Sequence, residues 1–357
     1  HENGTVATEA WRIRYATTTN GSIRDSFANI SGADQLFAVY VTDSNNTLVH
    51  NVTGRSINGG GSSGIAIDGT VNNTINISNS STVSGYGMYI GGANIRYSSG
   101  FSLENVGVYI GAATDVLGSN FTSNKSSAAY VSVASNFTNS TFISNVTAVD
   151  IVGGNNVFSK STFISDRGTP ILISAGTHNF SNSTIHSNLT WISSIGTATV
   201  SNFSNTTFVT GNGSIFLKGN VTFPGRTLLN ITNLNITNAT ARVNSTNSSF
   251  LNTSATITLN NITFADPQTT YDSADTGSFA ACPASKCTEI SYAGGIARFN
   301  VSSFTSFSVQ ETEQSSRVVR MSSALAEYTQ CQEASRARLR VSTCRQVTLC
   351  WIVQDSQ

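Results

Sequence analysis

Short segments with an apolar residue at the first and third position recur along the centre of the chain, each followed by glycine or another small residue. Their central residues step by 23, 20, 41, 22 and 44 positions, so the long steps are about twice the short ones. Alternation with a period of two is typical of a half-buried strand. The segments are 65–67, 88–90, 108–110, 149–151, 171–173 and 215–217.

A second series has the same period but a different phase. Six-residue segments rich in Ser and Thr begin with a phenylalanine and end with Phe or Ile, and they start 21, 22 and 23 residues apart. Residues five apart point to opposite faces of a straight strand, so the chain must bend if both ends enter one core. The third residue of each segment is the predicted bend, because Asn tolerates left-handed backbone angles. Lys160 shares that position with Asn139, Asn182 and Asn205, which predicts that the column faces water.

Repeats of this length, with several short strands each, predict a right-handed parallel β-helix of about eight or more coils of 20–23 residues. A propeller of the WD40 type needs blades of about 40 residues with their own signatures. A β-sandwich gives no reason for aligned self-similarity. Stacked coils predict one inward-facing column, formed by Ile67, Ile90, Ile110, Ile151, Ile173 and Leu217.

The pattern divides the chain into four regions. Residues 1–60 are predicted to form an N-terminal cap with irregular first coils, and 61–220 the β-helix. Residues 221–312 lose the period but keep strand-like runs, which predicts a small β-sandwich-like module. Within it, Cys282 and Cys287 are placed to form a disulfide across a short loop.

The tail, residues 313–357, differs in composition from the rest. From 315 onward it has no Asn and no Gly, yet it holds six of the fifteen Arg and three of the five Cys. Acidic residues precede basic ones between 322 and 340, an order that suits the dipole of a helix. The run 347–353 is uncharged and prone to form a strand. A shifted reading frame is the alternative explanation of the abrupt change.

Composition excludes two classes of function. The chain has 19 basic and 19 acidic side chains and only 11% charged residues, against roughly 25% in an ordinary domain. Because phosphate neutralisation needs a basic surface, nucleic acid is not an expected partner. No window approaches the roughly 20 apolar residues of a membrane span, so none is expected.

Acceptor triplets for N-glycosylation, Asn-x-Ser/Thr, are in large excess. The sequence contains 28 of them, whereas random placement of its 37 asparagines would give about 10. Each triplet is typical of the surface of a secreted protein, although runs of Asn, Ser and Thr also suit turns and strands. The predicted glycosylation sites are Asn29, Asn51, Asn76, Asn120, Asn136, Asn139, Asn145, Asn179, Asn182, Asn188, Asn202, Asn205, Asn220, Asn230, Asn235, Asn261 and Asn300.

Between about residues 60 and 310 the chain resembles a known family, the large, heavily N-glycosylated archaeal cell-surface proteins with right-handed parallel β-helix repeats. The resemblance rests on the Phe-Ser/Thr-Asn-Ser-Thr-Phe repeats and on the segments 282–287, 291–292 and 299–308. It implies a cell-surface location and a role as an envelope, filament or adhesion component. Family members often end in a membrane anchor, and no such anchor is expected here.

A catalytic or metal site is not predicted. Parallel β-helices also host polysaccharide lyases and hydrolases, whose sites need clustered carboxylates or carboxylates with cations. Asp68 and Asp150 belong to different phases of the coil, and Asp166 with Arg167 is typical of a solvated turn. The four histidines are spread along the chain without nearby Cys or paired acids and are interpreted as surface residues. The remaining charged side chains weighed for such a site are Asp115, Lys160 and Lys218.

The resulting hypothesis is a secreted structural protein, a subunit of an extracellular filament, sheath or surface layer, with covalent N-linked glycans and no cofactor. Its expected partner is itself, with surface glycans as a second partner. The tail is predicted to add a strand to a neighbouring subunit, because an open solenoid end leaves unpaired strand edges. The assembly residues are Val347, Leu349, Trp351, Ile352 and Val353, and one of Cys331, Cys344 and Cys350 is left over for a free thiol or a cross-link. The alternatives are a carbohydrate-binding surface adhesin and, behind it, a glycan-cleaving enzyme.

Overall fold

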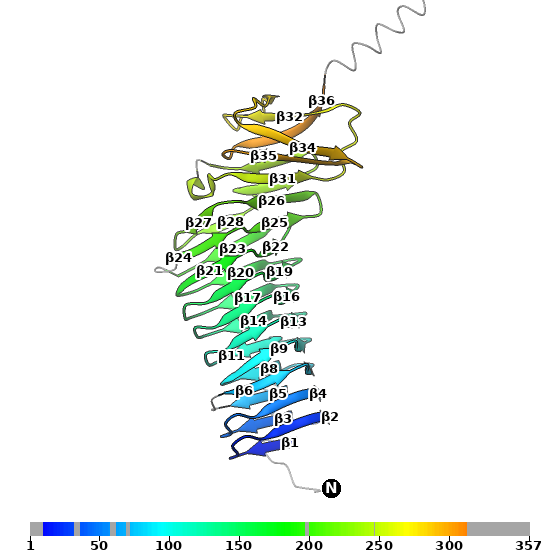
Figure 1. Ribbon diagram of the computed structural model, residues 1–357, viewed down its shortest axis with the longest axis vertical. Coiled ribbons are helices and arrows are strands. Elements are labelled where there is room, and N and C mark those ends of the chain that lie inside the picture. Colours follow the sequence, from blue (N-terminus) through cyan, green and yellow to red (C-terminus); the bar gives the residue numbers. More distant parts are fainter. Residues whose placement is uncertain are drawn as a thin grey trace, which may run out of the picture. The chain divides into compact units, whose positions relative to one another are not determined.

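The computed structural model describes residues 10–31, 36–57, 62–68, 72–196, 200–245 and 247–312. These residues are almost entirely strands, and their one helical element is the 3-10 helix η1 (Ser249–Leu251). Stacked parallel coils form a β-solenoid, which confirms the predicted fold class (Figure 1). The predicted helix at 322–340 and the strand at 347–353 lie outside the described residues.

Each coil from β5 onward contributes one strand to each of three faces, here named A, B and C. Face A consists of β1 (Ala10–Ala16), β3 (Leu36–Thr42), β5 (Ser63–Asp68), β8 (Tyr86–Ile90), β11 (Val108–Ile110), β14 (Ser127–Val131), β17 (Thr147–Ile151), β20 (Thr169–Ile173) and β23 (Thr190–Ser194). Face B consists of β6 (Asn73–Asn76), β9 (Ala93–Arg96), β12 (Asp115–Leu117), β15 (Asn136–Thr138), β18 (Val157–Ser159), β21 (Thr177–Ser181) and β24 (Val200–Ser204). Face C consists of β7 (Asn79–Thr82), β10 (Ser99–Ser102), β13 (Asn120–Ser123), β16 (Thr141–Ser144), β19 (Thr162–Ser165), β22 (Thr184–His186) and β25 (Thr207–Thr210).

The first coils are longer than the rest. In β2 (Ser22–Ser31) and β4 (Leu48–Ile57) one strand runs through faces B and C, and β4 pairs with both β6 and β7. Parallel pairing starts between β1 and β3, where partners such as Ile13 and Val39 are 26 residues apart. The stacked coils therefore start at residue 10, ahead of the predicted boundary at 61.

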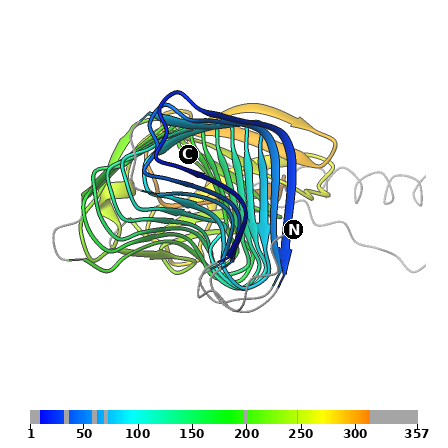
Figure 2. The ribbon, with the colours of Figure 1, turned by 90° about the horizontal axis from the view of Figure 1, so that it is seen from below.

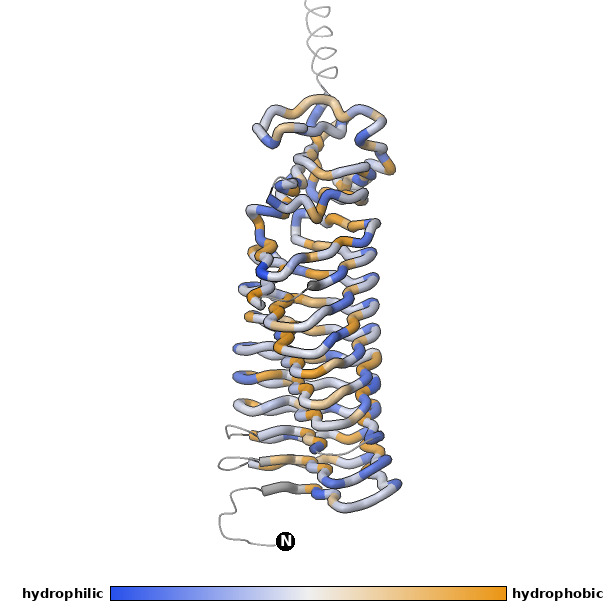
Figure 3. Tube along the Cα trace, turned by 90° about the vertical axis from the view of Figure 1, so that its left-hand side faces the viewer, coloured by the Kyte–Doolittle hydropathy of each residue, from blue (hydrophilic) through white to orange (hydrophobic). Residues whose placement is uncertain are grey.

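The inward column of face A follows the predicted register. Ile67, Ile90, Ile110, Ile151 and Ile173 pair from coil to coil and are fully buried, with Val131 filling the coil in between. Seen along the stack, the coils superpose (Figure 2), and hydrophobic segments recur at the same place in successive coils (Figure 3). The sequence prediction is wrong for Leu217, which is not part of this column. It is buried, but it lies in β26 (Gly213–Leu217), where the chain has already reversed direction.

The bends between faces B and C occur where the sequence predicted them. The residue at each bend has a left-handed backbone, with φ between 47° and 60°, and the amide of most of them donates to a carbonyl of the next coil. The bend column comprises Asp25, Asn51, Ile77, Tyr97, Gly118, Asn139, Lys160, Asn182 and Asn205. Lys160 and the three asparagines aligned with it are exposed, as predicted.

A ladder of buried serines follows the bend column. Each hydroxyl accepts the backbone N–H of the corresponding residue one coil earlier and donates to the carbonyl two residues before it in its own chain. Buried polar groups need such partners, and here one hydroxyl satisfies two backbone groups of the turn. The ladder comprises Ser78, Ser98, Ser119, Ser140, Ser161 and Ser183.

The parallel stacking of all three faces ends at an antiparallel strand. Face A ends with β28 (Leu228–Asn230), face B with β27 (Asn220–Phe223) and face C with the β25–β26 hairpin. Face C then continues through β31 (Ala255–Leu259), β35 (Ile296–Val301) and β34 (Cys287–Ala293). The second sheet of this module has the order β29 (Leu234–Thr237), β30 (Thr240–Val243), β36 (Ser306–Glu311), β32 (Pro267–Asp272) and β33 (Ala280–Ala281). The Phe299 and Phe307 rings, 6.2 Å apart, join the two sheets.

Residues 264–268 and 310–312 belong to a separate compact unit. In it the Glu311 carboxylate accepts the backbone N–H groups of Ala265 (2.8 Å) and Asp266 (3.0 Å). The rest of this unit lies in the part of the chain that the structure leaves undescribed.

Candidate functional site

The acceptor asparagines all reach the solvent. None of the 27 acceptors among the described residues is buried, and of the seventeen predicted sites eleven are exposed. The half-buried ones are Asn76, Asn145, Asn202, Asn230, Asn235 and Asn300. Side chains on faces B and C alternate inward and outward, and the acceptor triplets occur in the outward phase or at the bends.

Among the described residues two asparagines are buried, and neither begins an acceptor triplet. Asn73 and Asn156 occupy the same corner, where face A passes into face B. The Asn156 amide oxygen accepts the N–H of Ser135 (2.8 Å), and its Nδ2 donates to the carbonyl of Gly153 (2.9 Å). The fold therefore separates asparagines that satisfy the buried backbone from asparagines that a glycan can reach.

Acceptors in neighbouring coils lie close enough to compete for space. Asn179 and Asn202 are directly opposite each other on face B, and Nδ2 of Asn202 donates to Oδ1 of Asn179 at 3.1 Å. Asn136 makes the same type of bond with Asp115 at 2.8 Å. Because strands in a sheet are only about 4.8 Å apart, two branched glycans on adjacent coils cannot both extend freely. The crowding predicted for Asn182 and Asn205 applies equally to this face B pair.

A stack of tyrosines lies on the outer side of face A. Tyr89, Tyr109 and Tyr130 pair in register, with ring centroids 5.1 Å and 5.3 Å apart and interplanar angles of 2° and 9°. Tyr86 leans against Tyr109 at 5.2 Å. The rings cover one another's faces, so their edges and hydroxyls are what meets the solvent. Burial raises the pKa of Tyr89 and Tyr130, and the neighbouring carboxylates of Asp68 and Asp150 raise it further.

Asp150 continues the tyrosine column one coil beyond Tyr130. Its Oδ1 is buried and has no hydrogen-bond partner among the described residues, and burial raises the pKa of its carboxyl. Asp68 belongs to another position of the coil, since it pairs with Thr42 while Asp150 pairs with Leu172. The two carboxylates do not converge, as their sequence phases predicted. Asp166 and Arg167 are exposed in the turn after β19.

His178 is not a surface residue, so the sequence interpretation is wrong there. It is fully buried and lies in the same corner column as Asn156, one coil later. Nδ1 accepts the backbone N–H of Asn156 (3.2 Å), which leaves Nε2–H to donate to the carbonyl of Ala175 (2.8 Å). Burial lowers the pKa of His178, so the neutral ring is the structural form. One histidine in a hydroxyl-rich series gives no warning of this in the sequence.

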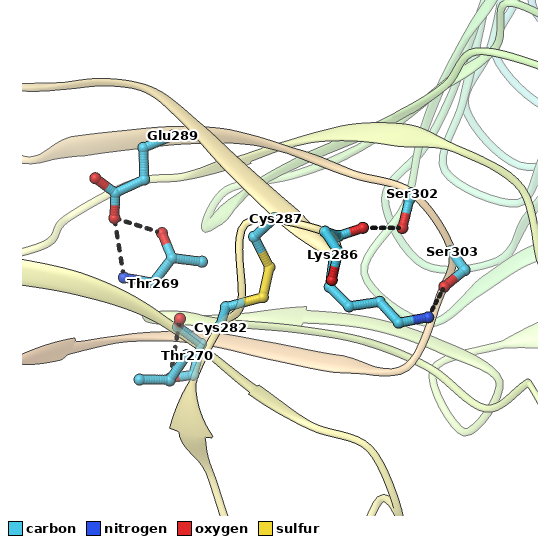
Figure 4. Close-up of a disulfide and its surroundings, with 10 residues drawn as sticks. Thr269, Thr270, Cys282, Lys286, Cys287, Glu289, Ser302 and Ser303 are labelled. Carbon is cyan, nitrogen blue, oxygen red and sulfur yellow. Dashed lines mark hydrogen bonds between the residues drawn. A yellow bond between two sulfur atoms is a disulfide. The ribbon is translucent and has the colours of Figure 1, made fainter.

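The distal module carries the predicted disulfide. Cys282 and Cys287 are bonded, with Cα atoms 5.9 Å apart, and the bond closes the loop before β34 (Figure 4). Around it, Glu289 accepts from both the backbone and the hydroxyl of Thr269, and Lys286 donates to Ser303 (3.3 Å). The disulfide and these hydrogen bonds hold the loop in one conformation, which is a structural role.

Among the described residues, no group of three or more His, Cys, Asp and Glu side chains is placed to hold a metal ion. The described part of the chain also has no helix with the length and apolar character for crossing a membrane. Comparison with known proteins found no matching family, no matching curated protein and no matching solved structure.

Proposed function

We propose that the chain is a secreted, N-glycosylated structural protein, a subunit of an extracellular filament, sheath or surface layer. The observation that carries the proposal is that every described acceptor asparagine reaches the solvent, whereas the two buried asparagines, Asn73 and Asn156, begin no acceptor triplet. N-glycans are attached in the secretory route, where a disulfide such as Cys282–Cys287 also persists. Because only 11% of the residues of the chain are charged, its surface would take much of its hydration from those glycans.

Glycopeptide mass spectrometry of the chain secreted by a glycosylating host tests the first part. We expect glycans at exposed acceptors such as Asn188. Asn179 and Asn202 should not both be fully occupied on one molecule, because their side chains touch. Bare asparagines throughout would refute the proposed glycoprotein, and full occupancy of both Asn179 and Asn202 would refute the crowding argument alone.

Assembly is proposed to use a sheet edge in the distal module. β34 pairs with β35 along one side, no other described strand pairs with it, and six of its seven residues are exposed. Ile290 on this strand is 48% exposed. An edge of this kind accepts an added strand, and we propose that the run 347–353 of a neighbouring subunit supplies it.

Two variants test the assembly. A chain that ends at Gln314 lacks the donor and should fold but stay monomeric, and Ile290→Lys should weaken assembly by placing a charge on the acceptor edge. Val146→Lys is the matched control, because Val146 is similarly exposed, at 45%, in a turn of the solenoid. Analytical ultracentrifugation and negative-stain images provide the readout. Filaments from the truncated chain would contradict the donor-tail mechanism.

A carbohydrate-binding surface adhesin is the second candidate. The outward tyrosine stack on face A favours it, because exposed phenol hydroxyls and ring edges can contact sugars. Glycan-array binding by the intact protein that is lost in Tyr109→Ala, with thermal stability retained, would support this candidate over a purely structural role.

A further inference from the structure

A recess interrupts the outer surface of face C near the beginning of the solenoid. Its volume is about 440 Å³, within the roughly 300–1,000 Å³ of small-molecule sites. It lies along one outward column in which Arg55, Ser81 and Phe101 follow one another on β4, β7 and β10. The short Ser81 side chain lies between the longer side chains of Arg55 and Phe101. Ser81 therefore forms the floor of the recess, and Arg55 and Phe101 form its two walls.

The two walls offer different chemistry. Neighbouring strands are about 4.8 Å apart, so Arg55 and Phe101, two strands apart, leave a gap of about 10 Å between their backbones. Arg55 is exposed, and among the described residues no carboxylate lies within ion-pairing distance of it. The Phe101 ring is 40% exposed and stacks on no other described ring. Val83 and Leu103 line the recess as well, and Ser56 and Thr82 complete the lining.

We propose that this recess binds an acidic saccharide, with the sugar ring against Phe101 and its carboxylate on the Arg55 guanidinium. A guanidinium binds a carboxylate through two parallel hydrogen bonds, and the apolar face of a pyranose ring packs on an aromatic side chain. The Ser81 hydroxyl lies between them, where it can exchange hydrogen bonds with sugar hydroxyls. A peptide is a poorer fit, because β7 is already paired on both sides and has no free edge.

The site is close to an acceptor asparagine. Asn79 precedes Ser81 by two residues on β7, so both side chains point outward, about 7 Å apart. Asn79 is exposed, and its Oδ1 accepts the hydroxyl of Ser99 at 2.6 Å. A glycan on Asn79 would stand beside the recess, so the ligand has two conceivable sources. We assign it to a separate molecule, and the experiment distinguishes the two sources.

The test uses the full chain produced without glycans, titrated with a trisaccharide of galacturonic acid and with the neutral galactose trisaccharide. Isothermal titration should detect the acidic sugar and at least tenfold weaker binding of the neutral one. Arg55→Gln should remove that preference, a loss of about tenfold or more for the acidic sugar. Phe101→Ala should weaken both sugars, and Ser81→Leu should abolish binding by filling the recess.

Arg167→Gln is the matched control, because it removes one exposed arginine and changes net charge equally. Thermal melting of every variant separates lost binding from lost fold. Equal affinities for the two sugars, unchanged binding by Arg55→Gln, or preference for an acidic peptide would overturn the proposal. Glycosylated protein that binds the probe only after Asn79→Gln would show that the chain's own glycan fills the recess, which would also overturn it. This test does not depend on glycosylation or assembly, so it can fail while the proposed function stands.

Discussion

Coils near the start of the solenoid and coils near its middle fill the same interior position with opposite residue types. At the inward position of face C, the early coils have Gly54, Ser80 and Gly100, and the later ones have Phe121 and Phe142. A Cβ on Gly54 would lie 2.3 Å from the carbonyl oxygen of Gly64, so the backbones of faces A and C touch there. Later coils keep these faces apart with stacked rings.

The later coils hold two parallel stacks of phenylalanine. On face B the rings of Phe137, Phe158, Phe180 and Phe203 are 4.5–4.8 Å apart, which equals the spacing between coils, and all are buried. Rings of the face C stack meet them edge-on, as in the pair Phe158 and Phe163 at 5.4 Å. The same backbone repeat is therefore stabilised by close backbone contact in one region and by aromatic packing in the other.

Phe158→Ala should have the largest effect on stability. It removes a ring that stacks on both of its neighbours and leaves a cavity in the later coils, where stacked rings hold the faces apart. Such a cavity costs about 3–5 kcal/mol of unfolding free energy. Phe27→Ala is the control, since Phe27 is 68% exposed and should change stability little. Denaturant unfolding of both variants gives the comparison, and similar losses would mean that the stack is not the main support of these coils.

Gly87→Ala should be the next largest, at about 1–3 kcal/mol. The added Cβ would lie 2.7 Å from the backbone nitrogen of Phe101 on face C and 2.3 Å from the carbonyl oxygen of Gly107 in the next coil, so these early coils cannot accommodate it without moving their strands apart. Gly211→Ala meets no atom within 4 Å and serves as the matched control. Hydrogen exchange should show faster opening of β8 and β11 in Gly87→Ala only. Unchanged hydrogen exchange in β8 and β11 would show that the faces can move apart at Gly87 without loss of stability.

His178 should make the solenoid less stable in acid. Because burial lowers its folded pKa, the unfolded chain binds the proton more readily, and stability falls as the pH decreases below about 6.5. His178→Asn should remove this part of the pH dependence and keep the fold, since Asn156 makes equivalent contacts one coil earlier. Parallel thermal melts between pH 8 and 5 measure it, and His186→Asn gives the contribution of the second histidine whose pKa burial lowers. Identical curves for wild type and His178→Asn would contradict the assignment.

The smallest effect is expected on the outer side of face A. Asp150→Tyr would extend the tyrosine stack and remove a buried carboxylate oxygen without a partner, so it should stabilise by about 0.5–1.5 kcal/mol. Burial raises the folded pKa of Asp150, so its destabilising effect grows as the pH rises above about 3.9. The gain from Asp150→Tyr should therefore be greater at pH 7 than at pH 3. A gain independent of pH would attribute it to ring packing alone.

The period, the bends and the placement of the acceptors were predictable because they depend on local repetition. Asn139 and Lys160 share one position of the repeat, and a residue of either type there marks an exposed, left-handed turn. The inward isoleucines of face A follow from the same period. Leu217 does not, because the antiparallel return at β26 keeps the alternating pattern while changing its partners.

The coil, its period and its solvent-facing asparagines follow from the sequence alone, since each results from residues that recur at one spacing. Which faces touch depends on the folded arrangement, because distances between non-neighbouring strands depend on all three faces of a coil together. That is why Gly87 lies against the backbone of Phe101 on face C, why His178 is buried against the backbone of Asn156, and why Arg55 and Phe101, 46 residues apart, form the walls of one recess. Because the coils stack, residues far apart in the sequence become neighbours on one face, and each coil contributes one residue to such a column.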